Sequence, residues 1–353
     1  IGTGATAIQC VPRLAEDAQH LFVFQRTPSS VDERGNRPTE PEWASTLQPG
    51  WHRRRRDNFL AVVDGAWPGE DMVGDRWGDL PQRSEAALAA AGSDLSEQER
   101  ELVLEIADFQ KMNEIRGRVD AIVADQATAE ALKPWYRNPC KRPTFSDEYL
   151  PAFNRPNVTL VDTGGRGVER ITERGIVVDG VEHEVDCIVF ATGFEVGRTH
   201  PGMSGSPAVH GRDGITFADH WRNGIRTFQG LTARGFPNLF CMGISQNAVA
   251  VNFVHVLDEQ AGHVAAMIKE AGQRQAPYVE PTAEAEDAWL TLVRQSNKPD
   301  PVLAECTPGY KNNEGMHVAR PDTYGGTALE FHDLIRKWRD GNGFADVLRD
   351  GTE

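Results

Sequence analysis

The sequence predicts an α/β protein with a Rossmann-like nucleotide-binding domain that carries a helical insertion. Three observations lead to this prediction: a glycine-rich loop near Ile1, apolar runs that end in glycine, and a stretch rich in Ala, Glu, Arg and Leu at about 40–133. A glycine loop that opens a helix, together with continuous apolar strands, is typical of open parallel sheets covered by helices. At 353 residues the chain is long enough for one large or two moderate domains.

The glycine-rich loop has the pattern G-x-G-x-x-A, formed by Gly2, Gly4 and Ala7. Glycine permits the tight turn and the close approach of backbone to a pyrophosphate. The next residues have helical spacing of apolar side chains, and the start of that helix would offer free N–H groups and the positive end of its dipole. We therefore predict cofactor contacts at the loop and the first helical turn, from Gly2, Thr3, Gly4, Ala5, Thr6 and Gln9.

A short apolar strand at 21–24 follows, and the residues after it distinguish between two cofactors. An NAD site carries a carboxylate at this point, whereas this chain has Gln25, Arg26 and Thr27. A carboxylate accepts a hydrogen bond from the ribose 2′-hydroxyl, while an arginine pairs with a 2′-phosphate. We therefore expect NADPH, with a purely structural glycine turn as the alternative. Because such a loop normally follows a buried strand, of which Ile1 would be the last residue, we also expect the sequence to be a fragment of a longer chain.

The composition restricts the possible partners and the cellular compartment. The net charge of −15 argues against nucleic acid or an anionic membrane as the main partner. No apolar run approaches the length of a membrane span. The five cysteines are scattered and never have C-x-x-C spacing. That pattern predicts a reducing compartment, the cytoplasm, with no disulfide framework and no metal site.

The predicted insertion ends shortly before a pair of cations. Its clearest helix covers 96–123 and opens with the capping pattern that Ser96 and Glu99 form; we interpret the insertion as a lid or packing module. Lys141 and Arg142 then precede Pro143, which disfavours the helical conformation at Arg142 and holds it extended. A Lys-Arg pair by itself is usually surface charge, but next to a cofactor site it becomes a candidate for binding or catalysis.

Two apolar runs in the second half predict buried strands, at 186–194 and 235–243, each with glycine at or near its end. A strand is also expected at 158–161, and hairpins at 169–185. A helix should begin near Asn252; His255, in its first turn, is interpreted as a packing or capping residue, with catalysis as the alternative. The apolar face of this helix is predicted to consist of Phe253, Leu257, Val264 and Ile268.

Taken together, these motifs resemble the Baeyer–Villiger-type flavin monooxygenases, the class B flavoprotein monooxygenases. The motifs are the G-x-G-x-x-A loop, Gln-Arg-Thr-Pro at 25–28, Cys-Lys-Arg-Pro at 140–143, Asp-x-Ile-x-Phe-Ala-Thr-Gly-Phe at 186–194, Gly-Phe-Pro-Asn-Leu-Phe at 235–240 and Cys-Thr-Pro-Gly-Tyr at 306–310. The resemblance covers the whole chain but only the C-terminal part of the family's usual length. The family's FAD-binding glycine motif does not occur in this sequence.

The resemblance implies an architecture and an activity. Residues 1–190 would form the NADPH-binding domain, and 191–353 the C-terminal part of a second, FAD-binding Rossmann-like domain with a C-terminal extension. NADPH would reduce FAD, O₂ would add to give a flavin peroxide, and the peroxide would insert one oxygen atom into a lipophilic ketone to give an ester or lactone. Two alternatives stay open: a related enzyme that oxygenates nitrogen or sulfur, and a non-catalytic NADPH-binding module.

The resemblance also implies roles for individual residues. Arg26 and Lys141, with Thr27 nearby, would hold the 2′-phosphate through charge-assisted hydrogen bonds. Arg142 would be the catalytic cation at the flavin, because arginine stays protonated at any working pH. The flavin contacts implied for the second domain are Thr192, Gly193, Asn252 and Phe253. The dipole of the helix behind Asn252 would favour a reduced, anionic ring.

Overall fold

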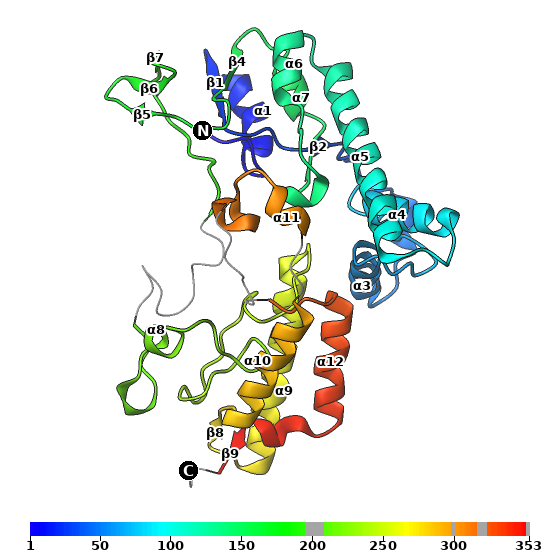
Figure 1. Cartoon of the computed structure of the whole chain (residues 1–353), viewed down its shortest axis with the longest axis vertical. Helices are drawn as coiled ribbons and strands as arrows, with labels where there is room; N and C mark the ends of the chain where they lie inside the picture. The colour runs from blue at the N-terminus through cyan, green and yellow to red at the C-terminus, as the bar shows by residue number, and fades with distance from the viewer. Residues whose placement is uncertain (195–207, 298–300, 316–322, 351–353) are drawn as a thin grey trace. The chain divides into compact units, whose positions relative to one another are not determined.

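The computed structural model describes residues 1–194, 208–297, 301–315 and 323–350, and these fall into two compact units (Figure 1). Unit 1 consists of Ile1–Trp51, Met72–Phe194 and Pro301–His317. Unit 2 consists of His52–Asp71, Glu195–Asp300 and Val318–Glu353. Within the described ranges, no helix combines the length and the apolar character that crossing a membrane requires.

The centre of unit 1 is a pair of parallel strands. β1 (Leu21–Gln25) lies beside β4 (Val158–Asp162), with Leu21 opposite Val158 at one end and Gln25 opposite Asp162 at the other. Side chains of a strand alternate between its two faces. Val23 packs with the apolar side chains of α1 (Ala7–Asp17), whereas Phe24 packs on the opposite side with Ile176 and Val178. The predicted helix–strand order and the predicted strand at 158–161 are therefore confirmed.

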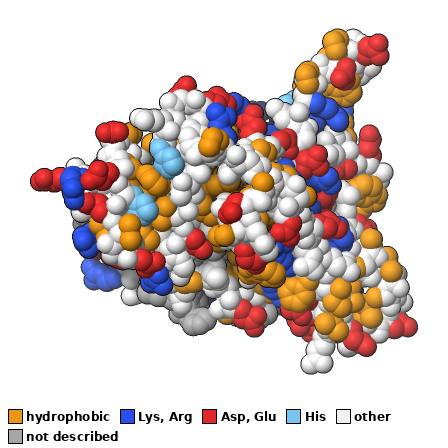
Figure 2. Space-filling model, turned by 90° about the horizontal axis from the view of Figure 1, so that it is seen from above, with side chains coloured by type: hydrophobic (Ala, Val, Ile, Leu, Met, Phe, Trp, Pro, Cys, Tyr) orange, Lys and Arg blue, Asp and Glu red, His pale blue; other side chains and the backbone are white. Residues whose placement is uncertain are grey.

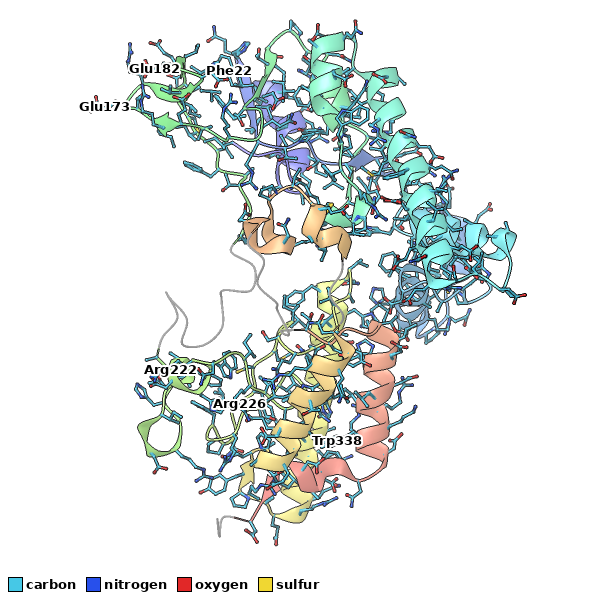
Figure 3. The ribbon with its side chains drawn as sticks, in the orientation of Figure 1. Phe22, Glu173, Glu182, Arg222, Arg226 and Trp338 are labelled. Carbon is cyan, nitrogen blue, oxygen red and sulfur yellow. A yellow bond between two sulfur atoms is a disulfide. The ribbon has the colours of Figure 1, made fainter. Side chains whose placement is uncertain are left out.

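A three-stranded antiparallel sheet covers the second face of β1. It consists of β5 (Arg170–Ile171), β6 (Gly175–Val178) and β7 (Val181–Glu184), as the two turn signals predicted. The ring of Phe22 points from β1 towards this sheet and lies 5.2 Å from the ring of His183 (Figure 3). In Figure 1, α6 (Gln126–Leu132) and α7 (Tyr149–Ala152) lie on the other side of β1 and β4, where their side chains join the cluster around α1.

The prediction of a buried strand at 186–194 is wrong. This segment forms no regular strand, and most of its side chains are exposed. Its backbone does pair with Ile1: the ammonium of Ile1 donates to the carbonyl of Val189 at 2.7 Å, and the N–H of Ala191 donates to the carbonyl of Ile1 at 2.8 Å. These two backbone hydrogen bonds do not make up the repeated ladder that defines a strand.

The insertion is helical, as predicted. Its helices in unit 1 are α2 (Pro41–Ser45), α4 (Asp79–Ala91), α5 (Glu97–Ile122) and α6. The capping box is confirmed: the hydroxyl of Ser96 accepts from the N–H of Glu99 at 3.3 Å, and the N–H of Ser96 donates to the carboxylate of Glu99 at 2.8 Å. Two further short strands, β2 (Val31–Asp32) and β3 (Thr144–Phe145), pair in parallel. The buried ammonium of Lys111 on α5 lies 2.5 Å from Asp32 and 2.7 Å from Asp79, so it ties β2 to two helices of the insertion.

A disulfide joins Cys140 to Cys306 and contradicts the prediction that the cysteines form none. Cys140 ends the short helix η1 (Asn138–Cys140), and Cys306 follows α11 (Pro301–Glu305), which is followed in turn by η3 (Tyr310–Gly315). The two cysteines are 166 residues apart in the sequence. Spacing along a chain does not disclose such a pair, because only the fold brings its members together. Cys10, Cys187 and Cys241 are free thiols.

Unit 2 is built mainly from helices around the larger of its two apolar clusters. Its large core side chains are Met267 of α9 (Phe253–Arg274), Trp289 of α10 (Ala283–Ser296) and Phe331 of α12 (Ala328–Asp340). Leu60 of α3 (Trp51–Val63) joins this core, so part of the insertion packs in unit 2. The indole of Trp338 on α12 donates to the carboxylate of Asp346 at 2.8 Å (Figure 3). The remaining elements are α8 (Phe217–His220), β8 (Tyr278–Val279), β9 (Leu348–Arg349), η2 (Arg212–Gly214) and η4 (Gly343–Asp346).

The predicted start of α9 is confirmed, but the predicted apolar face is not the face that the helix buries. Asn252 caps the helix by accepting from the N–H of His255. Phe253 and Ile268 are 47% and 55% exposed. The buried side chains are instead His255, Val256, Gln260, His263, Met267 and Ala271.

The polar residues on this buried face are only partly hydrogen-bonded inside the unit: His263 Nε2 pairs with Gln229 Oε1 at 2.7 Å, while its Nδ1 has no partner among the described residues. The side-chain amide of Gln260 exchanges two hydrogen bonds with the backbone of Gly243, at 2.6 and 3.0 Å. The segment 235–243 therefore pairs its last residue with a side chain of α9 rather than with a neighbouring strand. It forms no regular strand, and that prediction is also wrong.

The burial of His263 predicts a loss of stability in acid. Its side chain is 2% exposed, and burial, with a contribution from the charge of Arg339, lowers the pKa of His263 to about 3. The unfolded chain takes up this proton below pH 6.5, whereas the folded chain does not, so stability is present above pH 6.5 and is lost as the pH falls towards 3. When the pH falls from 7 to 5, protonation of His263 in the unfolded chain should lower the free energy of unfolding by about 2 kcal/mol.

Denaturant titrations at both pH values would measure the effect in the protein and in His263→Gln. The variant should retain part of the dependence, because burial also lowers the pKa values of His255 and His332. His210, which is exposed, provides the control substitution His210→Gln. If the free energy of unfolding depends on pH in His263→Gln as it does in the parent protein, His263 is not the source of the loss of stability in acid.

Candidate functional site

The glycine-rich loop is a turn that only glycine can form at its first position. Gly2 has a φ of +106°, and a Cβ there would lie 2.4 Å from the carbonyl oxygen of Ala191. Its N–H donates to the carbonyl of Phe24, at the end of β1, at 2.9 Å. The loop is thus fixed between β1 and the segment that carries Thr192 and Gly193, two exposed residues predicted to bind a cofactor.

The start of α1 has the features of an anion-binding site. Thr6 precedes the helix and makes no side-chain cap, and the first turn contains no acidic residue. The hydroxyl of Thr3 donates instead to the carbonyl of Thr27 at 2.8 Å, and the amide of Gln9 donates to the carbonyl of Ala5 at 2.7 Å. The first N–H groups of a helix have no partner within the helix. In α1 the N–H groups of Ile8 and Gln9 donate to the carbonyls of Gly4 and Thr6, at 3.0 and 3.1 Å, so an anion placed here would meet mainly the positive end of the helix dipole.

Arg26 and Lys141, far apart in the sequence, are brought together beside the end of β1. Both donate to the carbonyl oxygen of Pro308, at 3.4 Å from Arg26 Nη2 and 3.2 Å from Lys141 Nζ. Burial lowers the pKa of Lys141, and the charge of Arg26 lowers it further, while Glu314 acts in the opposite direction. Two cations that repel each other in this way form a site at which an added anion is stabilised.

Arg142 points to different neighbours from Lys141. Side chains of consecutive residues in an extended chain project to opposite sides. Lys141 Nζ lies 5.6 Å from the centre of the Tyr136 ring, whereas the guanidinium carbon of Arg142 lies 5.6 Å from the centre of the Trp77 ring. Trp77 in turn packs against Phe145 of β3, with ring centres 5.0 Å apart. A cation–π contact therefore orients the exposed guanidinium of Arg142.

The remaining predicted residues, Asn252 and Phe253, lie in unit 2. Asn252 is the capping residue of α9, and Phe253 presents a half-exposed ring in its first turn. The view in Figure 2 shows acidic and basic side chains interspersed over one face of the molecule.

Sequence reasoning missed three contributors to the site: Trp77, Pro308 and Glu314. Trp77 lies in the insertion, with no motif around it. The other two lie in the irregular stretch at 306–315, where Glu314 Oε2 is 3.1 Å from Arg26 Nη1. No periodicity or spacing signal connects that stretch with β1, because 288 residues separate the ion pair.

Comparisons with known proteins show which proteins the chain is similar to in sequence and in fold. No family model matches the sequence. Neopentalenolactone D synthase of Streptomyces avermitilis is 47% identical over 99% of this chain and 60% of its own length. A Baeyer–Villiger monooxygenase of Streptomyces coelicolor is 50% identical over 96% of this chain and 57% of its own length.

Solved structures give the same result. The polycyclic ketone monooxygenase of Thermothelomyces thermophila matches with a TM-score of 0.85 and 36% identity, over 98% of this chain and 58% of that one. An oxidised steroid monooxygenase bound to NADP matches with a TM-score of 0.73 and 25% identity, over 99% of this chain and 66% of that one. The fold is thus the mixed α/β fold of Baeyer–Villiger-type monooxygenases. The chain is homologous to these flavoprotein monooxygenases over nearly all of its length, which confirms the resemblance in the motifs. It spans about 60% of the length of the curated relatives that it matches.

Proposed function

We propose that the chain is part of an NADPH- and FAD-dependent monooxygenase that inserts one oxygen atom from O₂ into a ketone, giving an ester or lactone. The observation that carries this proposal is the Arg26–Lys141 cation pair beside the glycine turn and the start of α1. Homology to Baeyer–Villiger monooxygenases supports the reaction, and the names of a polycyclic ketone monooxygenase and a steroid monooxygenase among the neighbours support a lipophilic ketone as substrate.

In this proposal residues 1–190 are a Rossmann-like NADPH-binding domain, and 191–353 are the C-terminal part of the FAD-binding domain and its extension. The parallel pair β1–β4, with α1 between the glycine turn and β1, supports the first assignment. The finding that His52–Asp71 packs in unit 2 adds that the helical insertion contributes to both units.

The residues present fit NADPH. A pyrophosphate in front of α1 would meet the positive end of the helix dipole, with glycine at position 4 leaving room for it. A Cβ at Gly4 would meet no atom within 4 Å, so the space in front of the turn is open. The 2′-phosphate would bind between Arg26 and Lys141, whose mutual repulsion it would relieve.

The residues present fit FAD only in part. Thr192 and Gly193 are exposed, Gly193 has a φ of +95°, and Phe253 offers a half-exposed apolar ring. Thr192 and Gly193 belong to unit 1 and Phe253 to unit 2, and each of the two groups by itself suits a contact with a flat ring system. The sequence contains one G-x-G-x-x-A loop, which NADPH would use, so the chain supplies no second glycine loop for the pyrophosphate of FAD.

The chain's own residues then have separable tasks. FAD, when bound, would pass the electrons of NADPH to O₂. Arg26 and Lys141 would hold NADPH by its phosphate. Arg142, oriented by Trp77, would place a permanent positive charge beside the ketone oxygen that becomes negative during attack. Lys141 and Arg142 are adjacent in the sequence, and an extended backbone points their side chains to opposite sides. In the proposed site Lys141 therefore serves binding and Arg142 serves catalysis.

The choice of nucleotide tests this proposal directly. Calorimetric titration of the chain with NADP⁺ and with NAD⁺ should give at least about 10-fold tighter binding of NADP⁺, because each charge-assisted hydrogen bond to the phosphate contributes about 1.5–3 kcal/mol. Adenosine 2′,5′-bisphosphate should compete with NADP⁺, whereas adenosine 5′-monophosphate should compete weakly. Equal affinities for NADP⁺ and NAD⁺ would refute the phosphate site.

A further inference from the structure

We propose that Glu314 is an internal substitute for the 2′-phosphate. Its carboxylate occupies the Arg26–Lys141 cation pair when no nucleotide is bound, and NADPH must displace it in order to bind. This inference rests on the proposed function and adds to it a residue that tunes the preference for a phosphorylated nucleotide. We use the name strap for residues 306–315, which carry Glu314 and contain the Cys-Thr-Pro-Gly-Tyr motif.

The strap places acceptor oxygens where a phosphate is expected to bind. Glu314 Oε2 lies 3.1 Å from Arg26 Nη1, and the carbonyl oxygen of Pro308 accepts from both Arg26 and Lys141. A Cβ on Gly309 would lie 3.3 Å from Lys141 Nζ, so glycine allows the close approach of the strap. The two cations thus receive from the strap one carboxylate and one carbonyl oxygen, both of which a phosphate would replace.

The strap is held at this position by contacts that do not involve Arg26. Cys306 is bonded to Cys140, the residue immediately before Lys141. Lys311 Nζ donates to the carbonyl of Pro139 at 2.9 Å. Inside the strap, the side chain of Asn312 accepts from the N–H of Gly309 at 2.9 Å and donates to the carbonyl of Cys306 at 2.9 Å. The strap therefore remains next to the cations even when the ion pair is broken.

The ion pair itself is suited to displacement. The side chains of Arg26 and Glu314 are 49% and 52% exposed. Exposed ion pairs are weak, because water and salt screen them. A phosphate monoester carries more charge than a carboxylate and offers several acceptor oxygens to the two cations at once. It should therefore displace Glu314, and the nucleotide without the phosphate should leave Glu314 in place.

Removing the charge of Glu314 tests the competition. Calorimetric titration of Glu314→Gln should show about two- to five-fold tighter binding of NADP⁺ and unchanged binding of NAD⁺. Glu305→Gln removes an exposed carboxylate just before the strap, at the end of α11, and should bind both nucleotides like the parent protein. Because the effect is electrostatic, it should disappear at about 1 M salt.

Hydrogen exchange in the parent protein gives a second measurement that needs no variant. The N–H of Glu314 donates to the carbonyl of Gly309 at 2.9 Å, so displacement of Glu314 should speed exchange in the strap. NADP⁺ should produce this increase, and NAD⁺ should not.

Two results would overturn the inference. If Glu314→Gln binds NADP⁺ no more tightly than the parent protein, while both prefer NADP⁺ to NAD⁺, Glu314 is not a competitor and the proposed nucleotide site stands. If the parent protein binds the two nucleotides equally, the phosphate site and the inference fail together.

Discussion

In the complete monooxygenase of which the chain is proposed to be part, replacing Arg142 by alanine is expected to lower the rate of ester formation at least about 100-fold, while the enzyme loaded with FAD continues to consume NADPH. The physical reason is the timing of the charge. The ketone oxygen becomes negative only when its carbonyl is attacked, so a fixed cation beside it stabilises the transition state more than the ground state. Arg142 does not belong to the phosphate site, because it points towards Trp77. Nucleotide binding should therefore be nearly unchanged.

The measurement combines NADPH consumption, followed by absorbance, with product analysis after addition of a polycyclic ketone. Arg142→Lys should retain the charge but lose the planar contact with the indole, and we expect intermediate activity. Arg166→Ala removes an arginine that pairs with Asp179 on the exposed surface and serves as the matched control. Ester formation by Arg142→Ala at the parent rate would remove the catalytic role from this residue.

Local signals in the sequence were sufficient for the parts of the site that are local in the chain. The glycine turn, α1 and β1 occupy consecutive residues, and their glycine spacing and apolar periodicity predicted their order correctly. The capping box of α5 was predicted for the same reason, because all its hydrogen bonds lie within four residues of Ser96.

Predictions failed where the partner of a segment lies elsewhere in the chain. The run at 235–243 is apolar enough for a strand, yet its terminal Gly243 pairs with the side chain of Gln260. The same hydrogen bonds explain why Gln260 lies on the buried face of α9, which hydrophobic periodicity could not anticipate. Glu314, Trp77 and the disulfide were missed because each acquires its role only through a contact across more than 60 residues.

Replacing Arg26 by alanine is expected to weaken NADP⁺ binding about 10- to 100-fold and to change NAD⁺ binding little. The guanidinium would make charge-assisted hydrogen bonds to the 2′-phosphate, each worth about 1.5–3 kcal/mol, and the nucleotide without that phosphate has no such group. Arg26→Lys should recover part of the loss, because the charge remains while the bidentate geometry does not. A similar loss for both nucleotides would mean that Arg26 supports the fold of the site rather than reading the phosphate.

The double variant of Arg26 and Lys141 makes this test more specific. In the proposed site both cations contact one phosphate. The losses of NADP⁺ binding free energy in the two single variants should therefore not sum to the loss in the double variant. In the absence of nucleotide the charge of Arg26 lowers the pKa of Lys141. Arg26→Ala should therefore raise the pKa of Lys141, which NMR of labelled lysine can follow, and NADP⁺ should raise it in the parent protein as well. If the pKa of Lys141 responds neither to Arg26→Ala nor to NADP⁺, the two cations do not interact, and the proposal of a shared phosphate site is contradicted.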